Sequence, residues 1–508
     1  MLCSRSLVVC ASLTVALVGC RSASSWSHAT APTAPLAPHS ERAIADACES
    51  AKRPISESGV ESPKVRLAAH SEDAALDLDD ENTATPSFDG DDPFAGRDEL
   101  PLDELVAAVK ARNPSLQAAL ATWSAAANKY PQAIALDDPM FQSMYAPATW
   151  NAASNVQGSY YFGVAQKIPW AGKRALRGNQ ANWEATAASF DVGEAQLRLA
   201  EAARLAFLDY YLNQRERELN AASREALREF RDVARAKYEA NQVTQQDVLQ
   251  ADVELAQLEQ RQIELAQEWT VAAARINTLL HRRPDHSLPS PPKKLTVSEE
   301  LPPVDGLREW AVEHRPELHA MAARVQAERS AVALACKEFY PDFEVMGRYD
   351  RFWTDSVQRP QVGLNMNVPL NQAKRHAAVQ EALWRVHKMQ ADYDQAADNI
   401  RNEVQSAHAR VRGTRRTVRL YESKILPAAR DNVAAARAGY EAGTVDFLRL
   451  VEAQRQIIEL REKHQMAITE FHRRTAELER AVGDDGLPHE SVPPVPATEP
   501  PPLPDDSQ

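Results

Sequence analysis

Apolar residues recur at every seventh position along two long stretches of the chain. The first stretch carries them before and after a short polar turn, at Leu205, Leu212, Leu219, Ala226, Val233 and Ala240, then at Ala251, Leu258, Leu265 and Ala272. The second stretch carries them at Ala397, Val404, Val411, Val418 and Ile425. A sustained seven-residue repeat predicts long helices that pack side by side with a left-handed supercoil. Residues 174–238 contain no proline, so they allow one helix of about 100 Å at ~1.5 Å per residue, whereas Pro427 predicts a kink in the second stretch.

Short segments of alternating apolar and polar residues interrupt the helical stretches. In the second half, one face carries Val362, Leu364, Met366 and Val368, and another segment aligns Phe343, Val345, Tyr349 and Trp353. In the first half, the shared face carries Tyr160, Phe162, Val164 and Ile168, and a partner strand falls somewhere in 139–150. One-sided apolar strands of about ten residues are typical of outer-membrane barrels, although soluble hairpins show the same alternation. Four strands cannot close a barrel, so the chain must oligomerise if they enter a membrane.

The two halves repeat one another. The stretch "YEANQVTQQDVLQADVELAQL", which begins at Tyr238, aligns without a gap with "YEAGTVDFLRLVEAQRQIIEL", which begins at Tyr440. "FGVAQKIPWAGKR" likewise matches "VGLNMNVPLNQAKR" with one inserted residue. A repeat of roughly 200 residues is too large for a solenoid unit and indicates duplication of a whole structural half. We expect the repeats at 101–300 and 301–483.

The two ends of the chain differ from its middle. The apolar run from Leu7 to Val18 follows Arg5 and predicts a signal peptide over residues 1–19. Gly19 followed by Cys20 fits a bacterial lipobox, so we expect Cys20 to be lipidated; an ordinary secretory signal is the alternative. Residues 20–100 are acidic and Pro-rich and predict a disordered tether, and residues 484–508 predict a disordered Pro-rich tail.

Composition narrows the chemistry. The net charge of -13 disfavours nucleic-acid binding, which needs a basic face. Once the signal peptide and Cys20 are set aside, only Cys48 and Cys336 remain, so we expect no disulfide framework. The sequence contains no P-loop, nucleophile elbow or metal-ligand spacing, so we expect no catalytic residue, cofactor or metal site. We expect the pairs Lys173-Arg174 and Lys374-Arg375 to be ordinary solvated charges at helix starts.

With these features the chain resembles the outer-membrane efflux proteins of the TolC family, particularly the lipoprotein members. The resemblance covers about residues 101–483 and rests on the "VAQKIPWAGKR" and "NVPLNQAKR" junctions and the two tyrosine motifs. It implies a mostly α fold with a small β part, in which each protomer adds four transmembrane β-strands to a trimeric 12-stranded barrel. The duplicated long helices would continue as an α-barrel across the periplasm. Pro169 and Pro369 would mark the strand-to-helix junctions, since proline removes a ladder donor.

The resemblance also assigns a role to the repeated tyrosine motif. In the family, this motif forms helical hairpin turns at the periplasmic tip, where adaptor hairpins dock. The residues implied here are Tyr238, Asn241, Val243, Tyr440, Gly443 and Val445. The family's acidic gate ring aligns with Arg449 and Glu452. Glu452 keeps the acid and Arg449 departs from it, which puts a purely acidic entrance in doubt; Arg449 would pair with Glu452 or with Asp446 of a neighbour.

The function implied by the resemblance is a passive exit duct in the outer membrane, extending into the periplasm. Its partners would be two further copies of the chain, a periplasmic membrane-fusion adaptor, an inner-membrane pump of RND or ABC type, and outer-membrane lipids. The alternative is a lipid-anchored periplasmic coiled-coil spacer or adaptor without a pore. The alternating segments favour the channel.

Overall fold

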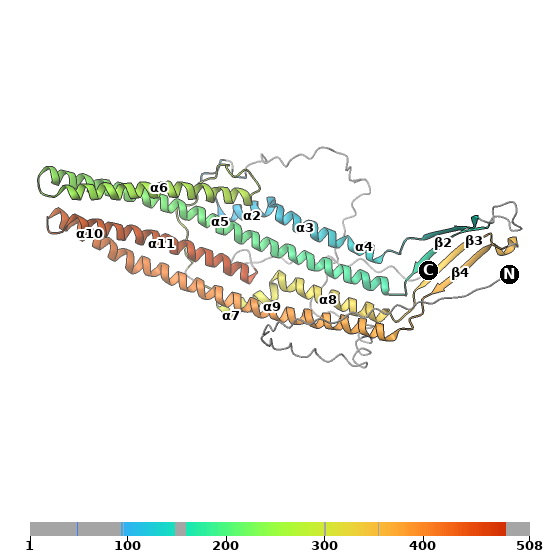
Figure 1. Cartoon of the computed structure of the whole chain (residues 1–508). Coiled ribbons are helices and arrows are strands. Elements are labelled where there is room, and N and C mark those ends of the chain that lie inside the picture. Colours follow the sequence, from blue (N-terminus) through green and yellow to red (C-terminus); the bar gives the residue numbers. More distant parts are fainter. Residues whose placement is uncertain are drawn as a thin grey trace, which may run out of the picture.

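The computed structural model describes residue 48 and residues 93–94, 96–147, 159–298, 301–353 and 355–483. The predicted signal peptide, the lipidation at Cys20, most of the predicted tether and the predicted tail lie outside the described residues. The described chain is elongated, with a small sheet at one end and two helical hairpin tips at the other (Figure 1).

The two halves contain the same series of elements. The first half runs α2 (Leu102–Arg112), α3 (Pro114–Ala127), α4 (Lys129–Ile134), β1 (Met140–Tyr145), β2 (Tyr160–Ile168), α5 (Lys173–Glu239) and α6 (Gln245–Leu279). The second runs α7 (Val304–His314), α8 (Pro316–Lys337), β3 (Phe343–Asp350), η2 (Ser356–Gln358), β4 (Pro360–Met366), α9 (Gln372–Leu420), η3 (Tyr421–Ile425), α10 (Leu426–Glu441) and α11 (Phe447–Val482). Each half thus follows short helices with a hairpin, a long helix, a turn and a returning helix.

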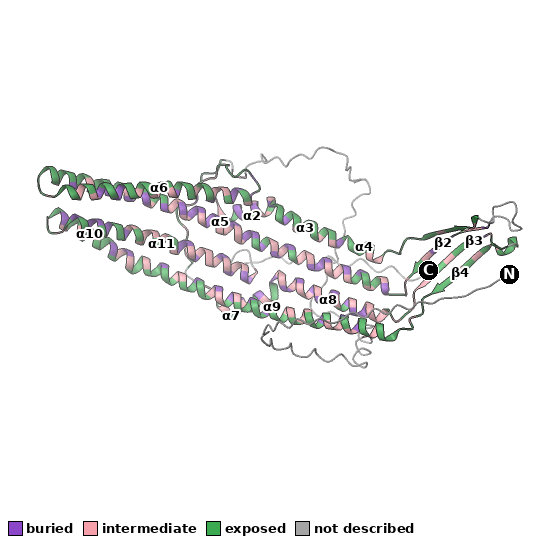
Figure 2. Cartoon of the chain, viewed as in Figure 1, coloured by how far each residue is buried: buried purple, intermediate pink, exposed green. Residues whose placement is uncertain are grey.

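The four strands form one antiparallel sheet in the order β1-β2-β3-β4. The register pairs Phe162 with Tyr349, and Val345 with Leu364. The predicted apolar positions of both hairpins therefore share one face, and most of them are exposed (Figure 2). Trp353 and Val368 were predicted on these strands but lie beyond their ends.

The helical seam agrees with the predicted register in α9 and also in α6, where Ala251, Leu265 and Ala272 are buried, but it disagrees in α5. In α9, Val404, Val411 and Val418 are buried as predicted. In α5 the predicted register is wrong by one residue, because the buried column consists of Leu199, Ala206, Asn213, Asn220, Leu227 and Ala234. The amides of Asn213 and Asn220 donate to the carbonyl oxygens of Leu265 and Leu258 on α6, at 3.1 and 3.2 Å. These hydrogen bonds satisfy the buried amides, so polar residues occupy seam positions that a search for apolar residues passes over.

The kink predicted at Pro427 takes the form of a π-helical turn. The turn η3 separates α9 from α10, and Pro427 lies in the first turn of α10. The helix continues through this turn, because the Leu426 N–H donates to the Tyr421 carbonyl oxygen, and a proline within a continuing helix supplies no N–H and crowds the preceding turn. The irregularity is therefore taken up just before the proline.

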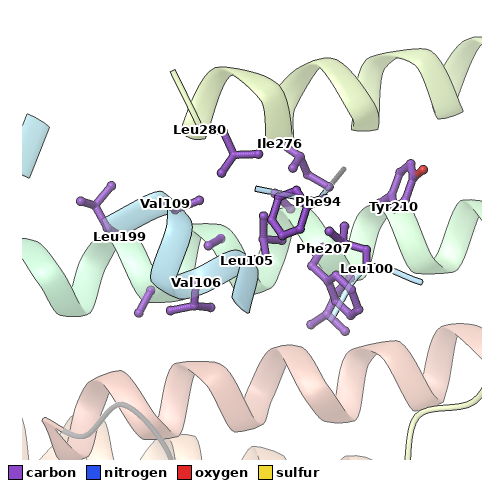
Figure 3. Packing of buried hydrophobic residues seen from close by; sticks show 14 of the residues in the cluster. Phe94, Leu100, Leu105, Val106, Val109, Leu199, Phe207, Tyr210, Ile276 and Leu280 are labelled. Atoms are coloured by element: carbon purple, nitrogen blue, oxygen red, sulfur yellow. The ribbon is translucent and has the colours of Figure 1, made fainter. Parts of the chain in front are cut away.

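The largest core of the first half lies where the short helices cover α5 and α6. Phe94 and Leu100 from the N-terminal segment pack with Leu105 of α2, Phe207 of α5 and Ile276 of α6 (Figure 3). A second cluster joins α7, α9 and α11 in the other half. Both clusters hold the long helices together far from the sheet.

Candidate functional site

The two hairpin turns at the tip have the same construction. Asn241, after α5, has a φ of 56°, and Gly443, after α10, has a φ of 75°. The next residue closes each turn, because Gln242 N–H donates to Lys237 O at 2.8 Å and Thr444 N–H donates to Gly439 O at 2.9 Å. Glycine and asparagine are the residues that most readily adopt a left-handed conformation at a helix end. Both turns therefore use the residue type that their geometry requires.

The two motif tyrosines have different environments. Tyr440 is 3% exposed, and its ring lies 5.4 Å from that of Phe447. The Lys237 ammonium lies 4.2 Å from the centre of the Tyr440 ring and donates to the Tyr440 carbonyl oxygen. Tyr238 is 42% exposed. The second-repeat motif is therefore packed against the first hairpin, while the first-repeat motif faces outward.

An apolar cluster joins the two hairpins near their tips. It contains residues from α5, α6, α10 and α11, namely Leu227, Phe230, Ala234, Ala251, Leu255, Tyr440, Phe447, Leu450 and Val451. Val243 and Val445 lie half-buried in the turns. Gly439 allows a close approach, because a Cβ built there would lie 2.5 Å from Val445 Cγ2. The sequence search did not identify Gly439, whose equivalent in the first repeat is Lys237.

The three gate candidates lie at the start of α11. Asp446, Arg449 and Glu452 are all exposed. Within the described residues none of the three forms an ion pair. In this single chain they therefore present charge to solvent at the tip, and the predicted pairing of Arg449 with Asp446 would need a neighbouring copy.

Sequence reasoning missed an ion pair that joins the two returning helices. Arg455 of α11 donates to Glu254 of α6 through its Nε, at 2.7 Å, and Glu254 is buried. Arg455 also donates to Gln257 at 3.2 Å. The sequence shows only that Glu254 and Arg455 carry opposite charges. Nothing in the local pattern shows that two positions 201 residues apart are neighbours.

The strand-to-helix junctions lie at the opposite end of the helices. Pro169 directly follows β2, and Pro369 lies between β4 and α9. The Trp170 N–H donates to Asp342 Oδ1 at 2.8 Å, and the Trp170 ring stacks on Tyr340 at 5.2 Å. These contacts join the junction of the first half to the loop before β3.

Lys173 corrects the prediction of a solvated charge. Its side chain is 1% exposed, and its ammonium donates to Asp342 Oδ1 at 2.9 Å and to the Tyr340 carbonyl at 3.3 Å. Glu338 lies 3.4 Å away. Burial favours protonation of Asp342, but the Trp170 N–H and the Lys173 ammonium outweigh it and lower the pKa of that carboxyl group. Lys173 is therefore a structural cation that links the halves.

A disulfide bond settles the state of the two remaining cysteines, which the sequence left open. Cys48 and Cys336 are joined, with a Cα–Cα distance of 5.6 Å. Cys336 lies near the end of α8, so the bond attaches residue 48 to the part of the second half that precedes the sheet. Spacing gave no indication of it, because the cysteines are 288 residues apart.

The described residues hold neither a metal-binding cluster nor a membrane-spanning helix. They contain no cluster of three or more His, Cys, Asp or Glu side chains that could hold a metal ion. None of the helices described is both long and apolar enough to span a bilayer.

Together, an amphipathic four-stranded sheet, long helices and paired hairpin tips define the duplicated fold of outer-membrane efflux channels. The model of the outer membrane efflux protein family matches residues 307–484 of the chain. The TolC-like resemblance seen in the sequence is thereby confirmed.

A curated relative and two solved structures are similar to the chain. The cobalt-zinc-cadmium resistance protein CzcC of Cupriavidus metallidurans is 21% identical over 184 residues, which are 36% of this chain and 43% of that protein. The match thus spans less than half of the relative's length. The outer-membrane channel OprN superimposes with a TM-score of 0.65 at 21% identity, covering 75% of this chain and 89% of OprN. The outer membrane protein VceC of Vibrio cholerae gives 0.64 at 18% identity, covering 75% and 96%. These structural similarities establish a shared fold.

Proposed function

We propose that this protein is the outer-membrane exit duct of a tripartite efflux system and acts as a homotrimer. Each protomer would contribute four strands to a 12-stranded barrel, and the long helices would form a conduit through the periplasm. The duct would be passive, because the chain carries none of the sequence motifs for nucleotide hydrolysis.

The apolar face of the sheet carries this proposal. Val362 is 88% exposed, Leu364 66%, Phe141 68% and Tyr145 70%. In water, so much exposed apolar surface on one small sheet would be unfavourable, whereas in lipid it is the surface that a barrel presents. A spacer without a pore has no use for this face, so the observation favours the channel over the alternative.

The open edges of the sheet support the trimer. Among the residues that the structure describes, β1 and β4 each pair on one side only. Within a bilayer, unpaired strand edges carry a large free-energy cost, so each edge must pair with another copy. Three copies give twelve strands, which is enough to close a barrel. The outward face of α6 also exposes Leu249, Val253, Ile263 and Val271, which neighbouring helices would cover.

The tips are the proposed docking and gating region. An adaptor would bind the hairpins around Tyr238, Asn241 and Val243 and around Tyr440, Gly443 and Val445, and an inner-membrane pump would supply the energy. Asp446, Arg449 and Glu452 would line the entrance. Cys20 would carry a lipid anchor, in the segment that we propose as a tether between the signal peptide and the repeats. CzcC is named for cobalt, zinc and cadmium resistance, so metal cations are the first cargo to test.

Planar-bilayer recording of the detergent-purified protein tests both the pore and the gate. We expect discrete conductance from a trimer, with selectivity for cations over anions. Glu452→Gln should lower this selectivity, because it removes one carboxylate per protomer from the entrance. The control is Asp247→Asn, which removes a charge from the first-repeat hairpin at the position equivalent to Arg449.

Three results would contradict parts of the proposal. A monomer that never conducts would exclude the channel and favour the spacer. Unchanged selectivity in Glu452→Gln would place that residue outside the lumen. An equal loss in Asp247→Asn would mean that total charge at the tip, and not a ring at Glu452, determines selectivity.

A further inference from the structure

A cavity of about 580 Å³ lies midway along the helices, away from the sheet and the tips. Four parts of the chain line it: α5, the linker at 293–295, the η3–α10 junction and α11. The cavity therefore lies between the first half, the linker and the second half. Any ligand held there would contact all three at once.

The charge on the cavity wall is mainly positive. Lys293, Lys294, Arg430 and Arg461 line it, and within the described residues none of these four forms an ion pair. Like charges that converge on one cavity without counterions raise the free energy of the empty site, and a bound anion removes that cost. The chain as a whole has a net charge of -13, so this concentration of cations is local.

A fifth cation contributes to the wall. The side chain of Arg215 is 12% exposed, and its guanidinium pairs with Glu218 at 2.7 Å. It also donates to the Lys293 carbonyl at 3.1 Å, which fixes the linker against α5. Its Nε is buried and has no hydrogen-bond partner in the described part of the chain. A donor of this kind is available to an acceptor that enters the cavity.

The acidic groups on the wall do not balance these charges. Glu218 is already paired with Arg215. Glu422 lies in the π-helical turn η3, 3.5 Å from His464 Nε2. Single π-turns within helices are frequent at functional sites because they redirect side chains. Without counting His464, five cations and two carboxylates line the cavity, which leaves an excess of three positive charges.

We propose that this cavity binds a small multivalent anion, of the polyphosphate or polycarboxylate class, which bridges the two halves of the protomer. The cavity has the size of a small-molecule pocket, and its cations come from separate elements, so an anion with several charged groups fits it better than chloride. The inference is independent of the pore, because the site lies within one protomer.

Isothermal titration calorimetry on the full-length, detergent-purified protein tests the site. Inorganic tripolyphosphate and citrate are the two probes, titrated at constant ionic strength. We expect one ion per protomer with micromolar affinity, and the tighter of the two probes identifies phosphate or carboxylate as the preferred group. Lys294→Gln combined with Arg461→Gln should weaken binding at least about tenfold, because each removes a contact to a charged group. Adding a probe should also raise the melting temperature of the unchanged protein more than that of the double variant, since a ligand that binds only the folded state raises the melting temperature.

The matched control is Lys374→Gln combined with Arg416→Gln, which removes two exposed cations of α9 outside the cavity. It should bind the probes within about twofold of the unchanged protein. Equal affinity in the cavity variant, or equal losses in both variants, would overturn the proposal, as would the absence of binding by either probe. The single change Lys294→Gln, on the exposed linker, serves if the double variant does not fold.

Discussion

At the level of single residues, Lys173 shows how a charge is kept inside the junction. Removing an ammonium from water costs several kcal/mol, and only close carboxylates and carbonyls offset this cost. Lys173 has both, in Asp342 and Tyr340. Asp342 is in a different situation, because its side chain remains 35% exposed and can be hydrated when its partner is lost.

This asymmetry predicts unequal effects of two substitutions. Asp342→Asn should destabilise the protein by about 3 kcal/mol, because it leaves a buried cation with only Glu338 as a charged partner. Lys173→Met should cost less, about 1 kcal/mol, because the exposed carboxylate regains water and the methionine fills the space. Thermal unfolding of the two variants and the double variant measures the order. A larger loss in Lys173→Met than in Asp342→Asn would show that Lys173 acts through packing and not through charge.

The same residue marks a limit of sequence reasoning. The position of Lys173 at a helix start was predictable from Pro169 and the end of the strand alternation. Its burial was not, because the partner Asp342 lies 169 residues away and comes near only when the two hairpins share a sheet. Gate candidates such as Glu452 were predictable as helix residues at the tip, but a single chain does not determine what faces a lumen.

At the level of elements, the seams show why the register of α5 was predicted one residue out. The prediction followed the larger side chains, Leu205, Leu212 and Leu219. The structure instead buries Ala206, Asn213 and Asn220. The side-chain amides of the two asparagines donate hydrogen bonds to backbone carbonyls of α6. In α9 the contact residues are valines, and the prediction was correct. Periodicity therefore predicted the presence and the length of the helices. It did not predict the buried face of α5, because the contact residues there are small or polar.

The hairpin turn allows a matched pair of glycine substitutions. Gly443→Ala should destabilise the second tip by about 1 kcal/mol, because an alanine at a φ of 75° is strained even where space is open. Gly413→Ala, in the interior of α9 and also with open space at Cβ, should stabilise by up to about 1 kcal/mol through helix propensity. Hydrogen exchange of the Thr444 amide reports the tip, and thermal unfolding reports both. Equal protection of Thr444 in Gly443→Ala would mean that the turn accepts other conformations.

At the level of the whole molecule, the duplication was the most predictable feature. Two gapless copies of one motif and two alternating hairpins specified the order of elements before any contact was known. The disulfide between Cys48 and Cys336 was not predictable, because Cys48 lies in a segment without periodic pattern. The contribution of this bond to stability depends on the length of chain that it closes into a loop, in the unfolded state and in the folded state.

The size of that effect follows from two loop lengths. In the unfolded chain the bond closes 288 residues. In the folded chain Phe94 is already fixed in the core, and residues 49–92 belong to the predicted tether, so the bond closes only the 46 positions from Cys48 to Phe94 (94 − 48). The difference in closure entropy, (3/2)RT ln(288/46), is about 1.6 kcal/mol. Cys336→Ser should therefore lower stability by about 1–2 kcal/mol, well below the roughly 6 kcal/mol that closing the full loop would give.

Thermal unfolding with and without a phosphine reductant measures this difference, and Cys48→Ser is the matched control, because it breaks the same bond from the other end. Both variants should melt at the same lower temperature and lose their response to reductant, while a non-reducing peptide map of the unchanged protein should contain the linked pair. A loss near the full-loop value would mean that the segment from Cys48 to Phe94 is held in place by further contacts. Absence of the linked peptides would show that the disulfide bond does not form.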